Sequence, residues 1–173
     1  MSLGYKLFIT TGALLVSPTA LAHYPSSNFG FLAGLMHPVT GVDHLIVLVL
    51  AGLFIGRLVS ARWIAISGLL LALGLGVVGA LLVGGQAWIE AAIVFSLPLF
   101  LALQWIKHDG SVKIALAAMS LFMVAHGWVH GIELDGMNLS FIFGLLIVSA
   151  MVMSVFSVIG IAIESRLTAL SDA

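Results

Sequence analysis

Five long apolar stretches, separated by short polar or glycine-rich breaks, dominate this chain. The 173 residues are 62% hydrophobic and only 8% charged, which leaves too little polar surface to cover a water-soluble globule. Lipid tolerates only backbone whose polar groups are paired internally, so each stretch is expected to form a helix. The sequence predicts an all-α membrane protein with a bundle of about five transmembrane helices. The expected spans are 41–57, 63–84, 87–106, 112–131 and 138–163, with 29–36 as an additional apolar turn or half-helix before the first.

The N-terminus has the pattern of a secretory signal peptide. Lys6 supplies a positive charge, 7–16 is apolar, and small residues precede a cleavage point after Ala22. This interpretation divides the chain into a signal peptide, 1–22, and a single transmembrane helical domain, 23–173. The alternative is an uncleaved anchor helix, although the apolar stretch is shorter than the roughly 20 residues that span a bilayer.

Basic residues outside this segment occur in alternate connections and near the C-terminus. By the positive-inside rule, these regions face the cytoplasm and the mature N-terminus lies outside, which a signal peptide also requires. The sequence thus predicts an integral protein of a bacterial cytoplasmic (inner) membrane, with a cytoplasmic C-terminus. The basic residues are Arg57, Arg62, Lys107, Lys113 and Arg166.

Charge and cysteine content exclude nucleic-acid binding and thiolate metal ligands. The formal net charge of −1 offers no basic patch for nucleic acid. The chain has no cysteine, so a bound metal must use nitrogen, oxygen or thioether ligands.

The first ionisable cluster, 37–44, precedes an apolar run. Ionisable side chains are costly inside a bilayer, so His37, Asp43 and His44 are candidates for a metal site. Pro38 predicts a helix break or start near His37. The positive end of a helix dipole repels cations, and Asp43 in the first turn would compensate. Asp43 either binds the metal directly or orients a ligating histidine.

The second cluster lies in the fourth predicted span. His126 and His130 are one turn apart and could close on one metal, with Glu133 further along the same face. Met119 and Met123 continue this stripe inward, either as a polarizable track or, more simply, as side chains that fill gaps in the packing.

Depth along the helices brings the two clusters together. At 1.5 Å per residue, His44 and His126 each lie roughly 20 Å from the nearest cytoplasmic basic residue. Glu90 and His130 lie roughly 26 Å from that side by the same measure. We therefore expect one ligand layer toward the outer leaflet, although Glu90 could instead reach the interface or pair with a histidine.

His23 is a separate candidate. After cleavage at Ala22, its free α-amine and imidazole could chelate one metal together. The alternative is a disordered terminus without a function in metal binding.

A stripe of small residues in the second span predicts close helix packing. The partner could be another helix of this chain or a second copy in a homo-oligomer. The stripe consists of Gly68, Ala72, Gly76, Ala80 and Gly84.

Two motifs, His37-Pro38-x-x-Gly41-x-Asp43-His44 and His126-Gly127-x-x-His130-Gly131-x-Glu133, together with the signal peptide and chain length, resemble the HupE/UreJ family. The resemblance covers essentially the whole chain. It implies a nickel or cobalt permease-like protein that supplies a hydrogenase, urease or cobalamin pathway. It also implies that the six ionisable residues of the two motifs bind metal.

Three functions remain open at the level of sequence. The favoured one is a secondary transporter that takes up Ni²⁺ or Co²⁺ from the outer side as cargo, without a prosthetic group. The second is an intramembrane, ceramidase-like hydrolase in which histidines hold Zn²⁺ and Asp43 activates water. The third is a non-transporting metal receptor or accessory membrane subunit. Imidazole ligands favour Ni²⁺, Co²⁺, Zn²⁺ or Cu²⁺ over Mg²⁺ or Ca²⁺.

Overall fold

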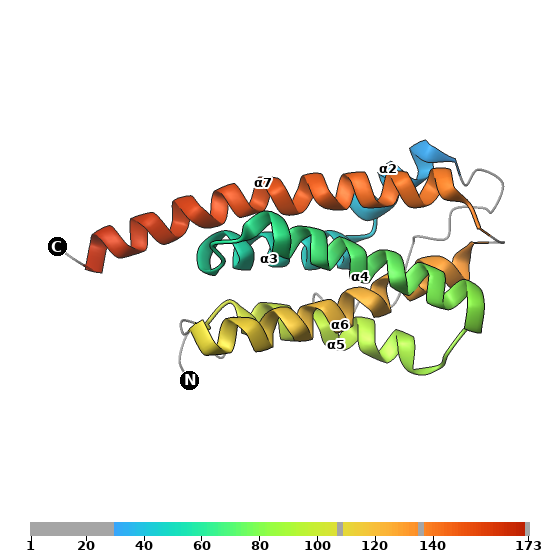
Figure 1. Cartoon of the computed structure of the whole chain (residues 1–173), viewed down its shortest axis with the longest axis horizontal. Helices are drawn as coiled ribbons and strands as arrows, with labels where there is room; N and C mark the ends of the chain where they lie inside the picture. Colours follow the sequence, from blue (N-terminus) through green and yellow to red (C-terminus); the bar gives the residue numbers. More distant parts are fainter. Residues whose placement is uncertain (1–29, 107–108, 135–136, 172–173) are drawn as a thin grey trace, which may run out of the picture.

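The computed structural model describes residues 30–106, 109–134 and 137–171, and these form a helical bundle (Figure 1). The proposed signal peptide and His23 lie outside the described residues. Six helices run through the described part: α2 (Phe31–Thr40), α3 (Val42–Leu58), α4 (Arg62–Val83), α5 (Trp88–Leu103), α6 (Asp109–Glu133) and α7 (Leu139–Ser171).

The prediction of an all-α membrane protein is confirmed. Among the described helices, α4, α6 and α7 are long and apolar enough to cross a bilayer. The pair α2 and α3 is a fourth candidate if it counts as one span bent by 79°. Helix α5 is apolar but has only 16 residues, because the chain leaves the helix at Gln104 rather than continuing to 106. It is thus shorter than the roughly 20 residues expected of a transmembrane helix.

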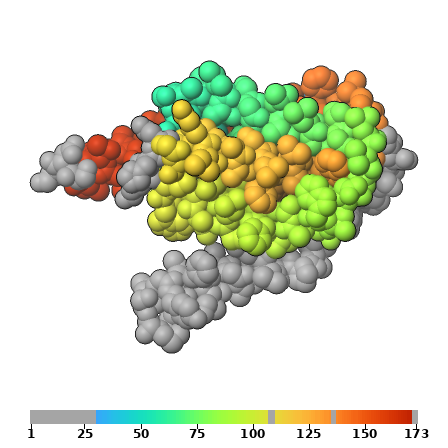
Figure 2. All heavy atoms as spheres, turned by 60° about the horizontal axis from the view of Figure 1, so that its bottom comes forward, coloured from blue at the N-terminus to red at the C-terminus, as the bar shows by residue number. Residues whose placement is uncertain are grey.

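Helix α7 is longer than a bilayer core. Its 33 residues correspond to about 50 Å, against a hydrocarbon thickness of about 30 Å. Its C-terminal end projects beyond the other helices (Figure 2). The last turns are exposed and polar enough to lie outside the lipid.

The break between α2 and α3 falls at Gly41, four residues after His37, where Pro38 predicted it. Pro38 is accommodated inside α2, and Gly41 adopts an extended conformation with φ −79° and ψ 101°. The Gly41 N–H donates to the His37 carbonyl over 3.0 Å, which closes the last turn of α2. A break near His37 was expected, and the structure places it between His37 and His44.

Close packing of α4 on α6 resolves the role of the small-residue stripe. A Cβ at Gly76 would collide with the Val124 carbonyl of α6, and one at Gly127 would collide with the Leu73 carbonyl of α4. The middle of the stripe therefore packs on a helix of the same chain. Its ends behave differently: a Cβ at Gly68 would meet nothing within 4 Å, and Gly84 has a φ of 85° at the end of α4.

Glycines also bring α7 against the bent pair. A Cβ at Gly34 would collide with the Phe141 carbonyl, and one at Gly144 with the Phe31 carbonyl. Further along, a Cβ at Gly56 would collide with the Ser157 carbonyl. Backbone contacts of this kind fix α2 and α3 on one side of α7.

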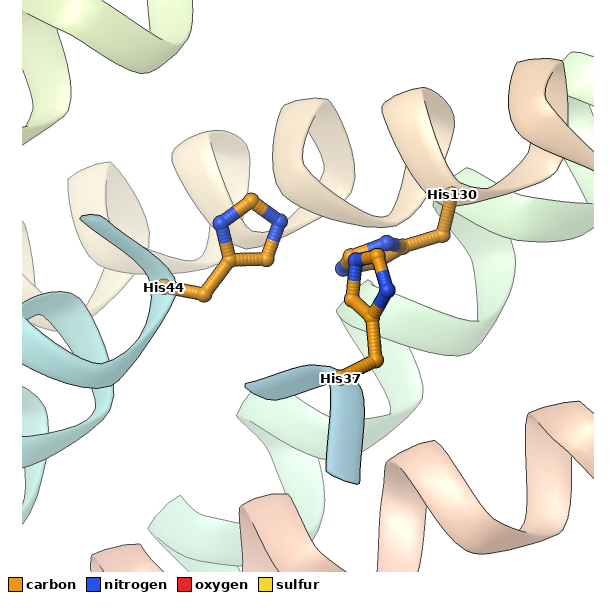
Figure 3. A group of neighbouring side chains, drawn as sticks. All are labelled: His37, His44 and His130. Atoms are coloured by element: carbon orange, nitrogen blue, oxygen red, sulfur yellow. The ribbon is translucent and has the colours of Figure 1, made fainter. Parts of the chain in front are cut away.

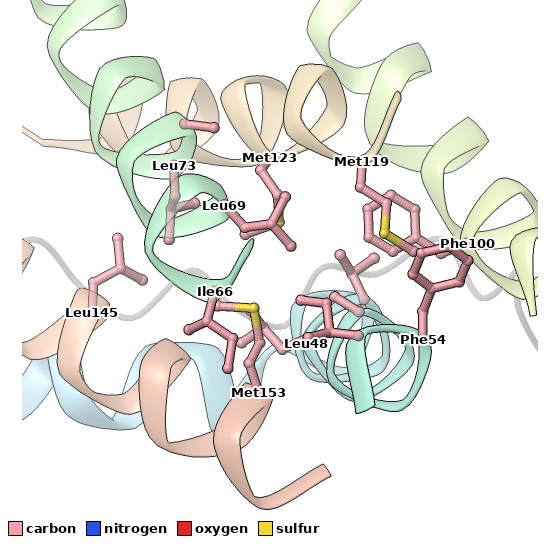
Figure 4. Packing of buried hydrophobic residues seen from close by; sticks show 14 of the residues in the cluster. Leu48, Phe54, Ile66, Leu69, Leu73, Phe100, Met119, Met123, Leu145 and Met153 are labelled. Carbon is pink, nitrogen blue, oxygen red and sulfur yellow. The ribbon is translucent and has the colours of Figure 1, made fainter. Parts of the chain in front are cut away.

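A layer of buried apolar side chains fills the middle of the bundle (Figure 4). Met119 and Met123 are 0% and 1% exposed, and Met153 of α7 is 0% exposed. Their burial among leucine and phenylalanine supports the interpretation that the methionines fill gaps. The other labelled members are Leu48, Phe54, Ile66, Leu69, Leu73, Phe100 and Leu145.

A polar network ties three helices together at the C-terminal end of α3. Arg57 Nε donates to Glu164 Oε2 over 3.0 Å, and Arg57 Nη1 donates to the Gln104 carbonyl over 2.8 Å. The Gln104 side-chain amide donates to the carbonyls of Leu50 and Phe100, both over 3.0 Å. These bonds join α3, α7 and the end of α5. Along α3, Arg57 lies about 20 Å from His44.

Candidate metal centre

Three imidazoles from three helices converge at the bend between α2 and α3 (Figure 3). His37 lies on α2, His44 on α3 and His130 on α6. One ring nitrogen from each lies within 4.8 Å of the others. The ring centroids are 4.6 Å apart for His37 and His130, 4.5 Å for His44 and His130, and 5.6 Å for His37 and His44. We call these three residues the histidine triad.

Local structure explains why the triad forms. The break at Gly41 turns α3 by 79° relative to α2, so both flanking histidines face the same region. On α6, Gly127 and Gly131 pack against the α4 backbone and hold His130 at a fixed distance from α4. Phe141 of α7 lies edge to face against His37, with centroids 5.6 Å apart.

Two nitrogens of the triad are buried without a hydrogen bond. Nε2 of His44 and Nδ1 of His130 make none to another described protein group. The side chain of His44 is 11% exposed, and His130 is 1% exposed. Buried polar atoms are normally paired, so these two nitrogens fit a metal ion as their missing partner.

Two carboxylates lie beside the triad. Asp43 Oδ2 is 3.1 Å from His44 Nδ1, which is a direct electrostatic contact. Glu133 Oε2 is 3.9 Å from His37 Nε2. Their side chains are 42% and 29% exposed, so they border the site on its accessible side. Two carboxylates beside the imidazoles would balance the charge of a divalent cation.

The spacing of the triad is close to what a transition metal requires. Nitrogen ligands lie about 2.1 Å from a transition metal such as zinc, so two of them can be at most about 4.2 Å apart. The triad nitrogens lie within 4.8 Å of one another, near that limit.

His126 is near the triad but has a different partner. Its ring centroid is 5.1 Å from that of His44, so the two rings are neighbours. Its Nε2 lies 2.9 Å from Ser96 Oγ of α5. His126 is thus outside the group of three histidines whose ring nitrogens lie together. His130 instead joins residues of α2 and α3.

A small cavity adjoins these rings on the side of the triad that faces the middle of the bundle. It touches three of the four clustered histidines and the buried thioether of Met123. Its lining consists of Pro38, His44, Val47, Leu48, Leu73, Met123, His126, His130, Leu145 and Ser149.

Glu90 does not join the triad in this structure. It lies in the first turn of α5 and is exposed, whereas its neighbour Ile89 is 1% exposed and faces the bundle. His23 lies outside the described residues. The residues that the structure gathers are thus the triad, Asp43, Glu133 and, at one edge, His126.

Sequence reasoning missed Ser96 and the packing role of two glycines. Each motif histidine of α6 is followed directly by a glycine, and Gly127 and Gly131 both contact α4. That repeated His-Gly pair was a readable signal for close helix packing. Ser96 had no comparable signal, because its contact with His126 joins residues on separate helices.

Comparison with known proteins assigns the chain to a family. The family described as HupE / UreJ protein matches residues 11–173. Protein HupE of Rhizobium leguminosarum bv. viciae is 32% identical over 136 residues, which cover 77% of this chain and 70% of that protein. No solved structure matches the chain. This integral membrane protein, with a histidine triad that could hold a metal ion, belongs to the HupE/UreJ family.

Proposed function

We propose that this protein is a secondary permease for a divalent transition metal, with Ni²⁺ as the first candidate cargo and Co²⁺ as the second. The observation that carries the proposal is the triad: three imidazoles from three helices, with buried, unpaired nitrogens at the bend of a membrane-embedded pair. Imidazole ligands favour Ni²⁺, Co²⁺, Zn²⁺ or Cu²⁺. The choice of nickel and cobalt rests on the family resemblance.

Each site residue has a distinct part in this proposal. His37, His44 and His130 bind the ion, while Asp43 and Glu133 offset its charge as water is removed. His126 borders the site and contributes to the inner part of the path. Glu90, exposed in the first turn of α5, and His23 would act on the approach of the ion to the triad.

The proposed orientation places the triad toward the outer side of a bacterial cytoplasmic membrane. In this arrangement the signal peptide, 1–22, is removed, and the domain 23–173 crosses the bilayer five times, with α2 and α3 as one bent crossing. The basic connections remain in the cytoplasm. Metal would enter beside Asp43 and Glu133, the more exposed members of the site.

The packed interior supports transport by rearrangement rather than through an open pore. Met119, Phe54 and Phe100 are fully buried between the triad and the Arg57 network. In this conformation these apolar side chains separate an ion held by the triad from the Arg57 network. Passage would require α3, α5 or α7 to move and the apolar layer to open.

A hydrolase is the second candidate, and one observation favours it. Three histidines are the protein ligands of some catalytic zinc sites, and Asp43 beside His44 could take a proton from a zinc-bound water. The cavity beside the triad is small, however, and lined mainly by apolar side chains. It suits a dehydrated ion better than a lipid amide.

One experiment distinguishes a permease from a hydrolase. Purified protein in proteoliposomes would be given radiolabelled Ni²⁺ or Co²⁺, with a matched Zn²⁺ assay. Asp43→Asn removes the charge beside His44 with little change in size, and Ser157→Ala is a control that removes a buried hydroxyl far from the triad. Accumulation in the wild type and control but not in Asp43→Asn supports a permease. Tight binding without accumulation would instead favour a receptor or hydrolase.

A further inference from the structure

A buried serine on α5 makes two contacts that together restrict the neighbouring histidine. Ser96 is 0% exposed, and its Oγ lies 2.6 Å from the Ile93 carbonyl of the same helix. The same Oγ lies 2.9 Å from Nε2 of His126 on α6. His126 is itself 2% exposed, so both partners are shielded from water.

The position of the protons follows from the chemistry of the hydroxyl group. A serine hydroxyl has a single proton to donate, and a carbonyl oxygen can only accept. At 2.6 Å, the oxygens of Ser96 and Ile93 would repel each other unless the hydroxyl proton lay between them. Ser96 therefore accepts from His126, and the His126 Nε2 carries the proton.

A neutral imidazole has one protonated nitrogen and one lone pair. With Nε2–H donating to Ser96, the lone pair of His126 is on Nδ1. His126 also lines the cavity beside the triad, with its ring centroid 5.1 Å from that of His44. Nδ1 is consequently the nitrogen that His126 can offer to an ion in this cavity.

We propose that Ser96 is a positioning residue that fixes the proton of His126 on Nε2 and reserves Nδ1 for a metal ion bound at the triad. This inference rests on the proposed metal-handling function. Helix α5 thus takes part in the site through Ser96, whose side chain acts on His126 and does not contact the ion. Partners that fix a ligand's tautomer typically change metal affinity by 10–100-fold when they are removed.

Other serines show why the second contact matters. Ser120 and Ser157 also donate to a carbonyl of their own helix, over 2.9 Å in each case. This bond is a common property of serine in membrane helices and by itself indicates no functional role. Four serines in the described helices donate to a backbone carbonyl: Ser96, Ser120, Ser157 and Ser165. Among these four, only Ser96 also contacts a histidine. Ser157, 3% exposed, is therefore a matched control.

The test uses full-length protein in nanodiscs and two readouts. Nitrogen NMR of ¹⁵N-histidine-labelled protein without metal reports which nitrogen of His126 is protonated, with the signal assigned from a His126→Asn variant. Titration with Ni²⁺ and Co²⁺ measures affinity. Both are applied to the wild type, Ser96→Ala, Ser96→Thr and Ser157→Ala.

We expect the wild type and Ser157→Ala to show His126 protonated on Nε2, and Ser96→Ala to populate both tautomers. Affinity should fall about 10–100-fold in Ser96→Ala and return to within about threefold of wild type in Ser96→Thr, which retains the hydroxyl. A wild-type His126 protonated on Nδ1 would overturn the proposal, as would unchanged affinity in Ser96→Ala. If the wild type binds neither metal, the proposed function fails, while the metal-free spectrum still reports separately on the Ser96–His126 contact.

Discussion

His44 and His130 face each other with ring centroids 4.5 Å apart, at an interplanar angle of 63°. The two residues belong to α3 and α6, which lie in different parts of the sequence. His37 of α2 completes the group, so no single helix carries the site. Metal binding should therefore depend on each imidazole and on the packing that brings the helices together.

Removing one imidazole should nearly abolish metal binding. His44→Ala and His130→Ala each delete one of three clustered ligands, and we expect affinity for Ni²⁺ to fall more than 100-fold, beyond the effect of losing an outer partner. Calorimetric titration of purified protein measures this change. Ser157→Ala should bind like the wild type. Retention of wild-type affinity by His44→Ala would rule out the triad as the binding site.

Bound metal should stabilise the fold, because the triad connects α2, α3 and α6. At a free metal concentration about 100 times the Kd, a ligand that binds only the folded state adds about 2.7 kcal/mol. Thermal unfolding in detergent with and without Ni²⁺ would show this as a higher Tm that a chelator reverses. The increase should be smaller in Asp43→Asn, which loses the carboxylate 3.1 Å from His44. An equal increase in a variant lacking all three histidines would point to binding elsewhere.

Two glycines of α4 provide a direct test of its packing on α6. In Gly76→Ala the new methyl group collides with the Val124 carbonyl, so we expect destabilisation of about 1–3 kcal/mol from overpacking. In Gly68→Ala the methyl group meets nothing within 4 Å, and stability should be unchanged or rise by up to about 1 kcal/mol. Denaturation of both variants in the same detergent makes the comparison. Equal stability would mean that α4 and α6 are not in close backbone contact.

The ion pair between Arg57 and Glu164 should contribute modestly to stability. Glu164 is 38% exposed, so a double-mutant cycle with Arg57→Gln and Glu164→Gln should give a coupling energy of about 0.2–1 kcal/mol. Arg57→Gln alone should cost more than Glu164→Gln, because it also removes the bond to the Gln104 carbonyl. Unfolding free energies of the four proteins provide the measurement. Purely additive effects would show that the two side chains do not interact in the membrane.

The positions of the helices could be predicted because each apolar run is long enough to leave few alternatives. Predicted and observed bounds agree within a few residues for α3, α4, α5 and α6, whereas α7 continues to Ser171, beyond the predicted end at 163. The number of full crossings was harder to predict. Helix α5 ends early at a turn formed by its own backbone, and the angle at Gly41 depends on how α7 packs against both flanking helices.

The sequence predicted which residues belong to the site but not which of them lie together. Depth calculations place His44 and His126 together, and their rings are indeed neighbours. Such calculations do not give the rotation of one helix relative to another. That rotation directs His126 toward Ser96 and leaves His130 beside His37 and His44. His126 and His130 share one face of α6, so spacing along that helix could not decide which of them joins His37 and His44.

The break at Gly41 places two of the three imidazoles on opposite sides of a single backbone joint. Any change in the angle between α2 and α3 must alter the separation of His37 and His44, now 5.6 Å between centroids. Linkage makes this relationship reciprocal: an ion that prefers one separation favours the corresponding angle, and a force that changes the angle weakens the hold on the ion by the same free energy. In the proposed permease, retention and discharge of the ion would then correspond to the closing and opening of this one hinge.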